Sequence, residues 1–211
     1  MKIFLFGATG RTGKEVLDQL LQQGYDVTVL VRSIIKLDYL KNSKLSIIEG
    51  DIFNPDSYKK ELSKSDVVIS TIGTGSSKKP TTIYSEGTGK IISVMKNAGI
   101  KKIIMVTAAA FDTTDPGANN FMVKYIARPL FKNIYSDMIT LESMLENEKD
   151  INWICIRPPR LTNGKLTRKY RVKINHCPEG GWRISRKDLA DFIVKQINSD
   201  EYTHKKPVIS Y

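Results

Sequence analysis

The chain contains little of what metal sites and disulfide frameworks need. Among its 211 residues there are two cysteines, Cys155 and Cys177, and two histidines, His176 and His204. Two cysteines far apart in the sequence predict neither a disulfide scaffold nor a zinc cluster, and the histidines have no further ligands at metal spacing. We therefore expect no metal, and reduced thiols in the cytoplasm.

Long apolar runs are also missing. No stretch of 18 consecutive apolar residues exists, and no basic segment precedes an apolar one at the start, where Ile3–Phe6 already has a strand-like pattern. These absences predict no signal peptide, no membrane span and no membrane partner.

Acidic residues are outnumbered, 22 against 33 lysines and arginines, which gives a net charge of +11. The cations are dispersed and acidic residues interleave with them, and the densest group, Lys165 to Lys173, is either a phosphate-binding ribbon or a solvated segment. Neither zinc-finger spacing nor the aromatic-basic signature of an RNA-binding sheet is present. The charge therefore indicates a soluble surface and does not favour a nucleic-acid partner.

Two families of catalytic motif are absent as well. There is no G-x-S-x-G elbow for a hydrolase. A hydrolytic phosphate loop ending at Gly13-Lys14 would need glycine at position 8 and serine or threonine at position 15, where the chain has Ala8 and Glu15. A nucleoside triphosphatase is therefore disfavoured.

What the chain does contain is a regular alternation of strands and helices. Apolar runs without a polar face predict a parallel sheet that helices cover on both sides. The expected strands are Ile3–Phe6, Asp26–Val31, Leu45–Glu49, Asp66–Ser70, Lys102–Val106, Asn152–Ile156, Tyr170–Ile174 and Pro207–Ile209. The expected helices are Arg11–Gln23, Ile35–Leu40, Ser57–Leu62, Ile83–Ala98, Phe121–Glu148 (interrupted at Pro129) and Lys187–Asn198.

This pattern predicts an α/β fold with a Rossmann-like, doubly wound parallel sheet. We expect residues 1–211 to form a single domain. Residues from about 160 to 211 are expected to contribute a small lobe on the substrate side.

The segment FGATGRTG follows the first strand and opens the first helix. In this position Gly7, Gly10 and Gly13 permit a tight turn, close approach of backbone N–H groups to a pyrophosphate, and contact between helix and strand. The N-terminus of the helix adds positive potential at the phosphates. The segment therefore predicts a dinucleotide-binding loop.

The end of the second strand indicates which dinucleotide. NAD-binding units usually place a carboxylate there, whereas this chain has Arg32 and Ser33. Arginine can bind a 2′-phosphate through two hydrogen bonds, and a carboxylate would repel it. Arg11 and Lys36 could join this pocket, with an exposed surface cation as the alternative at each position. We predict NADP(H) rather than NAD(H).

The chain has a family resemblance. It is carried by the motifs above and by VTVLVRS, EGDI, IGT, VTAA, RPPRLTNG and ISRKDLADF further along the sequence. It resembles the atypical short-chain dehydrogenases/reductases, in the group of biliverdin-IX-beta/flavin reductase and NmrA-like NAD(P)H-binding proteins. The resemblance implies a pyrophosphate loop, a 2′-phosphate pocket, an adenine border, a ribose segment and a nicotinamide segment. In that order the residues are Gly7, Thr9, Gly10, Arg11, Thr12 and Gly13; Arg32, Ser33 and Lys36; Asp51 and Ile52; Ile72, Gly73 and Thr74; and Thr107, Ala108, Pro158 and Pro159.

Two departures from the family pattern bear on catalysis. Flavin- and biliverdin-type relatives have serine where Ala108 stands, which leaves Thr107 as the nearest hydroxyl and our candidate catalytic residue. The Tyr-x-x-x-Lys pair of typical short-chain dehydrogenases is missing after the fifth strand, since Tyr125 is followed four residues later by Pro129. An alcohol dehydrogenase with an activated tyrosine is therefore not expected.

Two functions remain open. The first is an NADPH-dependent reductase that transfers a hydride to a small planar conjugated acceptor such as a flavin or a quinone. The alternative is a non-catalytic NADP(H)-binding redox sensor of NmrA-like type, with a protein partner. In both, the loop of residues 109–120 is a candidate lid, in which Phe111 either covers the ring or serves as a hydrophobic anchor.

Overall fold

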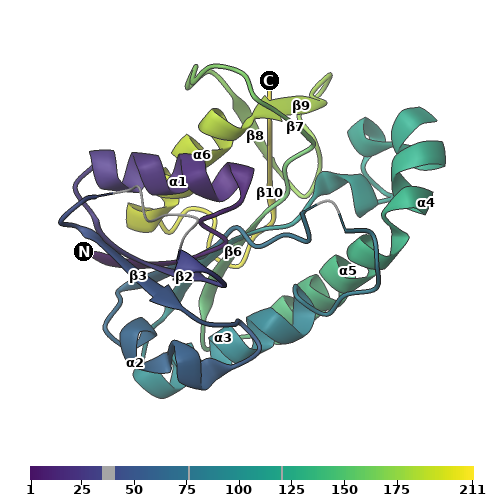
Figure 1. The fold of residues 1–211 in the computed structure, drawn as a ribbon. Coiled ribbons are helices and arrows are strands. Elements are labelled where there is room, and N and C mark those ends of the chain that lie inside the picture. Colours follow the sequence, from purple (N-terminus) through teal and green to yellow (C-terminus); the bar gives the residue numbers. More distant parts are fainter. Residues whose placement is uncertain (35–40, 76, 120) are drawn as a thin grey trace.

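The computed structural model describes residues 1–34, 41–75, 77–119 and 121–211. The helix expected at Ile35–Leu40 lies outside these residues. Six parallel strands form the central sheet in the order β3-β2-β1-β4-β5-β6 (Figure 1). Their bounds are Lys2–Phe6 for β1, Asp26–Val31 for β2, Leu45–Glu49 for β3, Val67–Ser70 for β4, Lys102–Val106 for β5 and Asn152–Ile156 for β6.

Helices cover both faces of this sheet, as Figure 1 shows. Their bounds are Arg11–Gln22 for α1, Lys59–Leu62 for α2, Ser85–Ala98 for α3, Lys132–Asn147 for α5 and Arg186–Lys195 for α6. Single turns of 3₁₀-helix occur at Pro55–Ser57, Ala109–Phe111, Pro116–Ala118 and Gln196–Asn198. The Rossmann-like fold class is confirmed.

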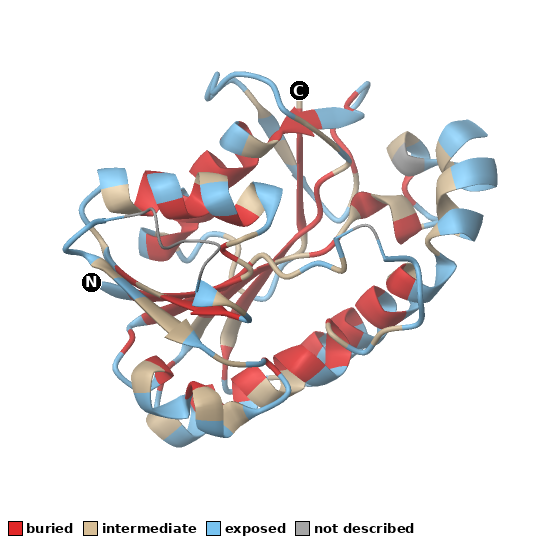
Figure 2. Ribbon diagram, viewed as in Figure 1, coloured by how far each residue is buried: buried red, intermediate tan, exposed pale blue. Residues whose placement is uncertain are grey.

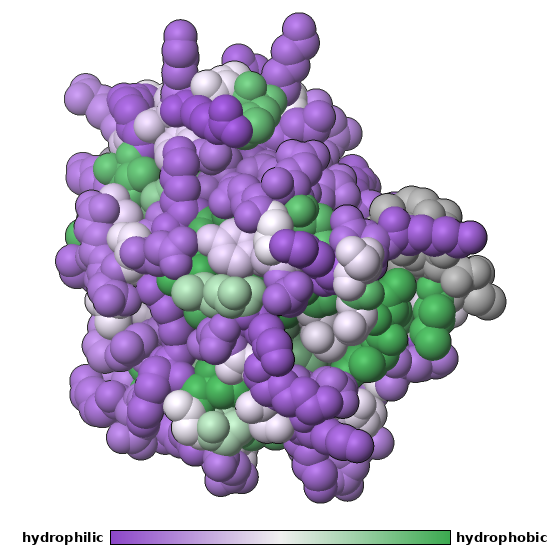
Figure 3. Space-filling view, turned by 90° about the vertical axis from the view of Figure 1, so that its left-hand side faces the viewer, coloured by the Kyte–Doolittle hydropathy of each residue, from purple (hydrophilic) through white to green (hydrophobic). Residues whose placement is uncertain are grey.

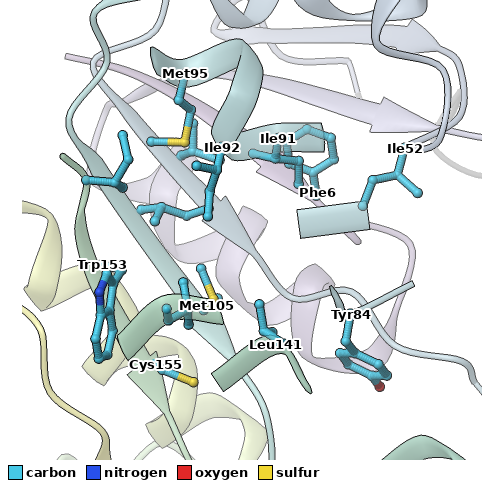
Figure 4. Packing of buried hydrophobic residues seen from close by; sticks show 14 of the residues in the cluster. Phe6, Ile52, Tyr84, Ile91, Ile92, Met95, Met105, Leu141, Trp153 and Cys155 are labelled. Carbon is cyan, nitrogen blue, oxygen red and sulfur yellow. The ribbon is translucent and has the colours of Figure 1, made fainter. Parts of the chain in front are cut away.

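The core has two parts, one on each face of the sheet. Leu5 of β1 packs with Leu17 of α1 and Ile193 of α6 on one face. On the other face, Phe6 and Met105 of the sheet belong to one core with Ile91 of α3 and Leu141 of α5 (Figure 4). Figure 2 shows the central strands as the most continuously buried segments. Burial on both faces explains why β1, β4, β5 and β6 have apolar residues at consecutive positions rather than at alternate ones.

The expected interruption at Pro129 is present and has a local cause. A π-helical turn, Val123–Ala127, precedes the short helix α4, Arg128–Leu130, and α5 begins after Phe131. Proline has no N–H to donate, and its ring collides with the carbonyl four residues earlier. A wider turn ahead of the proline relieves that collision. The long helix is therefore divided into two pieces.

The C-terminal segment extends the structure beyond β6. Strand β8, Arg171–Ile174, pairs antiparallel with β10, Pro207–Ser210, and the bridge between Arg157 and Val208 joins β10 to the end of β6. Two further strands, β7 at Arg160–Thr162 and β9 at Arg183–Ser185, pair in parallel. Strands of three residues are too short to give a recognisable pattern, and neither was predicted.

Asp188 is the buried anchor of this segment. Its carboxylate accepts hydrogen bonds from the backbone N–H groups of Thr167 (2.8 Å) and Arg168 (2.7 Å) and from the Tyr211 hydroxyl (2.6 Å). Burial acts to raise the pKa of this carboxyl, but the hydrogen bonds, led by that from Tyr211, hold the pKa below its usual value.

A depressed carboxyl pKa makes stability depend on pH. The contribution of Asp188 is present above the unfolded pKa of about 3.9 and is lost as the pH falls through the lower folded pKa. Asp188→Asn should lower the free energy of unfolding near neutral pH. On acidification, the free energy of unfolding should fall less in this variant than in wild type. Urea unfolding over a pH series measures this, with Asp200→Asn, at an exposed surface pair with Lys102, as the control. Parallel pH curves for wild type and Asp188→Asn would contradict it.

One face of the molecule is largely polar. Figure 3 shows a face on which hydrophilic side chains predominate and hydrophobic ones form small, separate groups. Among the described residues, no helix is both long and apolar enough to cross a membrane.

Candidate functional site

The strand order reverses between β1 and β4, which lie side by side in the sheet. In open α/β sheets, ligands bind beyond the carboxyl ends of the strands at such a reversal. Gly7 follows β1 and Thr71 follows β4, and a Cβ built on Gly7 would lie 2.7 Å from the Thr71 carbonyl carbon. The predicted pyrophosphate loop therefore lies at the reversal point.

Two of the three glycines are required by the chain's own backbone. Gly7 has a φ of +82°, a left-handed conformation that favours glycine, and its carbonyl accepts from Gly10 N–H at 3.0 Å. A Cβ on Gly13 would overlap the Gly7 carbonyl oxygen and lie 2.7 Å from its carbonyl carbon. The loop is thereby folded onto the start of α1, whose first N–H groups have no intrahelical acceptors.

A cation that the sequence did not point to lies beside this loop. Arg186 begins α6, which packs on α1, and partial burial, followed by the positive charge of Arg11, lowers the pKa of its guanidinium. Asn163 accepts a hydrogen bond from Arg186 at 2.6 Å. Like charges on Arg11 and Arg186 at one helix N-terminus favour an anion between them. Because 175 positions separate the two arginines, only the packing of α6 on α1 shows their proximity.

The remaining residues of the predicted loop and phosphate pocket follow the same edge. Thr9 and Thr12 are half-buried, and Arg11 is exposed. Arg32, directly after β2, is exposed, and Ser33 is half-buried. Since β2 neighbours β1, the end of β2 lies next to the glycine loop. The prediction for Lys36 lies outside the described residues.

The two residues predicted to border adenine face different surroundings. The carboxylate of Asp51 is exposed and accepts from Phe53 N–H at 2.8 Å. Ile52 is buried, and its Cδ1 lies 2.7 Å from where a Cβ on Gly87 of α3 would be. Figure 4 shows Ile52 among the core side chains of this face. Of these two residues, Asp51 is therefore the one whose side chain a ligand can reach.

After β4, the segment Ile72–Thr74 passes a buried tyrosine. The hydroxyl of Tyr84 lies 3.6 Å from where a Cβ on Gly73 would be, and it bonds to the backbone of Thr74. Burial raises the pKa of Tyr84 to about 12, so the phenol stays protonated. Tyr84 supports this segment, and no motif in the sequence pointed to it.

The residues predicted to surround the nicotinamide come together at the ends of β5 and β6. Thr107 N–H donates to the Ile156 carbonyl at 2.9 Å, and Ala109 N–H donates to the Pro158 carbonyl at 3.0 Å. These bonds continue the ladder past the strands and bring Ala108 and Pro158 to the same edge. Pro159, the next residue, is half-buried.

The Thr107 side chain does not match the catalytic role predicted for it. The residue is 5% exposed, and its hydroxyl donates to the Glu142 carboxylate at 2.8 Å and lies 3.4 Å from Cys155 Sγ. A hydroxyl whose proton is held by a buried carboxylate is not available to a substrate. The sequence missed this because Glu142 belongs to a helix 35 residues away.

Glu142 and Arg157 form the centre of a buried ionic network at this edge. Arg157 Nε lies 3.0 and 3.1 Å from the two oxygens of Glu142, and its Nη1 donates to Asp112 at 2.9 Å. Burial acts against the charge on Arg157, but the bonds and charge of Glu142 outweigh it and hold the pKa above its usual value. The guanidinium also lies 5.3 Å from the Phe111 ring centroid.

This network fixes the start of the candidate lid. Phe111 is buried and packs against Tyr135 with ring centroids 6.1 Å apart, so it is a hydrophobic anchor rather than a cover for the ring. Asp112 further accepts from the Thr114 hydroxyl at 2.7 Å. The loop after β5 is thus held to the end of β6 at its first residues.

A surface hollow of about 380 Å³ lies elsewhere, and none of its lining residues belongs to the predicted cofactor site. It is lined by Glu146, Glu148, Lys149, Trp153, Ile174, Asn175, His204, Lys205 and Lys206. The glycine loop and the strand ends, rather than this hollow, therefore form the candidate cofactor site.

Comparisons with known proteins give relatives of similar length and longer ones. An uncharacterized chloroplastic protein of Arabidopsis thaliana is 26% identical over 218 residues, covering 97% of this chain and 74% of its own length. Several other curated relatives are longer, and the chain spans between 32% and 44% of their lengths.

Solved structures share the fold across the whole chain. A Streptococcus pneumoniae TIGR4 protein proposed to be an NADH-flavin reductase superposes with a TM-score of 0.81 at 21% identity, covering 100% of this chain and 99% of that one. A short-chain dehydrogenase/reductase from Veillonella parvula DSM 2008, in complex with NADP, gives 0.79 at 17% identity, covering 100% and 94%.

A family model is more decisive than any single relative. The model described as NAD(P)H-binding matches residues 7–200, from the first glycine of the loop to just before the last strand. The chain therefore belongs to the NAD(P)H-binding family.

Proposed function

We propose that this protein is an NADPH-dependent reductase that transfers a hydride to a small planar conjugated acceptor, flavin-like or quinone-like. The observation that carries the proposal is the position of the glycine loop at the strand-order reversal, with Arg32 rather than a carboxylate at the end of β2. The S. pneumoniae structure described above adds flavin to the acceptors to be tested first.

The chain's own residues have distinct tasks in this proposal. The N-terminus of α1, with Arg11 and Arg186 beside it, binds the pyrophosphate. Arg32 and Ser33 receive the 2′-phosphate. The ends of β5 and β6, at Ala108 and Pro158, form the floor for the reacting ring.

The bound cofactor supplies a hydride, and the protein's part is to position the acceptor against it. A flavin or quinone can take its proton from water, so no dedicated acid is required. This fits a site in which the Thr107 hydroxyl is held by Glu142.

Arg32→Ala should separate the two cofactors. We expect NADPH affinity to fall about tenfold to a hundredfold, the loss of a charge-assisted hydrogen bond, while NADH affinity stays nearly unchanged. Calorimetric titration of wild type and variant with each cofactor measures this. Lys101→Ala, an exposed cation just before β5 at the opposite edge of the sheet, is the control. Equal losses for NADPH and NADH would reject the 2′-phosphate assignment.

The reductase is tested by turnover of the wild-type protein with NADPH, using FMN and a short-chain benzoquinone as acceptors. Oxidation of NADPH that depends on acceptor concentration supports the proposal. Tight NADPH binding without turnover of any planar acceptor would reject the reductase and retain the cofactor site.

One observation favours a second function, a non-catalytic NADP(H)-binding redox sensor. Neither Ala108 nor the buried Thr107 offers a hydroxyl to a substrate, and the tyrosine-lysine pair is absent from the segment after β5. The sensor predicts tight binding of NADPH and NADP⁺ with different affinities and no turnover. Fold alone does not separate the two functions.

A further inference from the structure

The segment Phe121–Leu130 stands apart from the body of the molecule and exposes its apolar side chains. It contains the π-helical turn and α4, and neither element has a buried residue. Figure 1 shows it at the far right, away from the central sheet, and Figure 2 shows it coloured as exposed or intermediate. Phe121 is 70%, Met122 62% and Tyr125 58% exposed, and Ile126 and Leu130 are exposed as well.

These side chains form one face. In the sequence FMVKYIARPL they follow one another at spacings of one, three, one and four residues, which places them along one side of a helical segment. The rings of Phe121 and Tyr125 are in contact, with centroids 5.0 Å apart. A group of large apolar side chains exposed together marks a surface that binds another protein or a membrane.

The charge around this face has a single sign. Between Asp115 and Asp137 the sequence contains no acidic residue. Lys124 lies 5.1 Å from the Tyr125 ring, Lys132 is exposed, and Lys78 is brought to 5.9 Å from the Phe131 ring. The apolar face is thus flanked by ammonium groups.

The segment is also attached firmly to the site. Arg128 donates to the Ala110 carbonyl and to the Asp112 carbonyl, each at 2.8 Å. A partner surface bound to this apolar face would therefore lie close to the loop after β5.

We propose that Phe121–Leu130 docks this protein onto an anionic lipid surface. Apolar side chains enter the boundary between headgroups and acyl chains, aromatic rings and lysines lie at headgroup level, and lysines gain from anionic lipid. A second copy of this chain would instead bring two positively charged segments together. An acidic protein would satisfy the lysines but gives no reason for five exposed apolar side chains on a protruding segment.

This inference is independent of the reductase proposal, and it revises the expectation of no membrane partner. That expectation rested on the lack of a long apolar run, which tests only whether a segment spans a bilayer. A short amphipathic segment lies on the surface instead.

The test is co-sedimentation with vesicles of an equal mixture of phosphatidylserine and phosphatidylcholine, and with vesicles of phosphatidylcholine alone. Wild type should bind the mixture, bind phosphatidylcholine at least about tenfold more weakly, and be released by salt. Phe121→Ser with Tyr125→Ser should lower binding to the mixture about tenfold or more. Circular dichroism checks that each variant folds.

The matched control removes two exposed apolar side chains outside the segment, Ile139→Ser with Met144→Ser on α5, and should bind as wild type does. The proposal is overturned if wild type binds neither vesicle, binds both equally, or if the two double variants bind alike. A wild-type dimer that the Phe121 and Tyr125 changes dissociate, seen by sedimentation velocity, would assign the face to a second copy. Polyglutamate binding that Lys124→Ala weakens, with no vesicle binding, would assign the face to an acidic protein.

Discussion

Glu142→Ala is expected to lower the free energy of unfolding by about 3 to 5 kcal/mol, the loss typical of a broken buried ion pair. The cause is Arg157, which would remain charged and buried without the carboxylate that faces its Nε and Nη2. Thr107 would lose its acceptor in the same step. Urea unfolding followed by circular dichroism measures the change through the shift of the midpoint.

Glu146→Ala provides the matched control. It lies on the same helix, one turn further on, and pairs with Lys206 through a side chain that is 59% exposed. Because the Glu146 carboxylate is exposed and Lys206 keeps Glu142 at 3.4 Å, losing this pair should cost at most about 1 kcal/mol, and the variant should remain near wild type. If the two variants were equally stable, the buried network would not stabilise the fold as we describe. Glu142→Leu combined with Arg157→Met should lose less stability than Glu142→Ala, because the buried guanidinium is removed together with the carboxylate it faces, and Asp112, which loses its partner, is nearer the surface.

Gly13→Ala is expected to open the loop and to lower NADPH affinity by about a hundredfold. Several hydrogen bonds from the loop to the phosphates would lose their alignment at once. The added methyl group would overlap the Gly7 carbonyl oxygen and approach the Thr71 hydroxyl to 2.8 Å, so backbone has to move. Calorimetric titration measures the affinity, and thermal unfolding measures the accompanying loss of stability.

Gly89→Ala is the control for this glycine. A Cβ there would meet only the flexible end of Met144, at 3.3 Å, within helix α3. Alanine is favoured over glycine inside a helix by up to about 1 kcal/mol, so this variant should bind NADPH normally and unfold no more easily than wild type. Normal NADPH binding by Gly13→Ala would show that the loop does not need the close approach of Gly13.

The sheet and the glycine loop could be predicted because their signals are local. Each central strand contains a short run rich in apolar residues, and four of them have the predicted bounds: Asp26–Val31, Leu45–Glu49, Lys102–Val106 and Asn152–Ile156. The loop combines glycine spacing with a strand before it and a helix after it. The sequence therefore led directly to the edge of the sheet where the cofactor is expected.

The side-chain partners could not be predicted, because they come from distant parts of the chain. Nothing near Thr107 indicated that Glu142 would take its proton, and nothing near Arg11 indicated Arg186. The exposed face of Phe121–Leu130 was missed for a related reason. An apolar helical pattern has the same appearance whether the face packs on the core or points to solvent.

The packing of α6 on α1 has a consequence for synthesis of the chain. Leu17 and Leu20 of α1 are buried against a cluster that includes Phe192 and Ile193, and Gln19 donates to the Lys187 carbonyl at 2.9 Å. A ribosome adds residues at about 5 to 20 per second, so α6 follows α1 by roughly ten to thirty seconds. During that interval the apolar face of α1 lacks its cover. The nascent chain therefore presents a chaperone-binding surface that disappears only when α6 emerges.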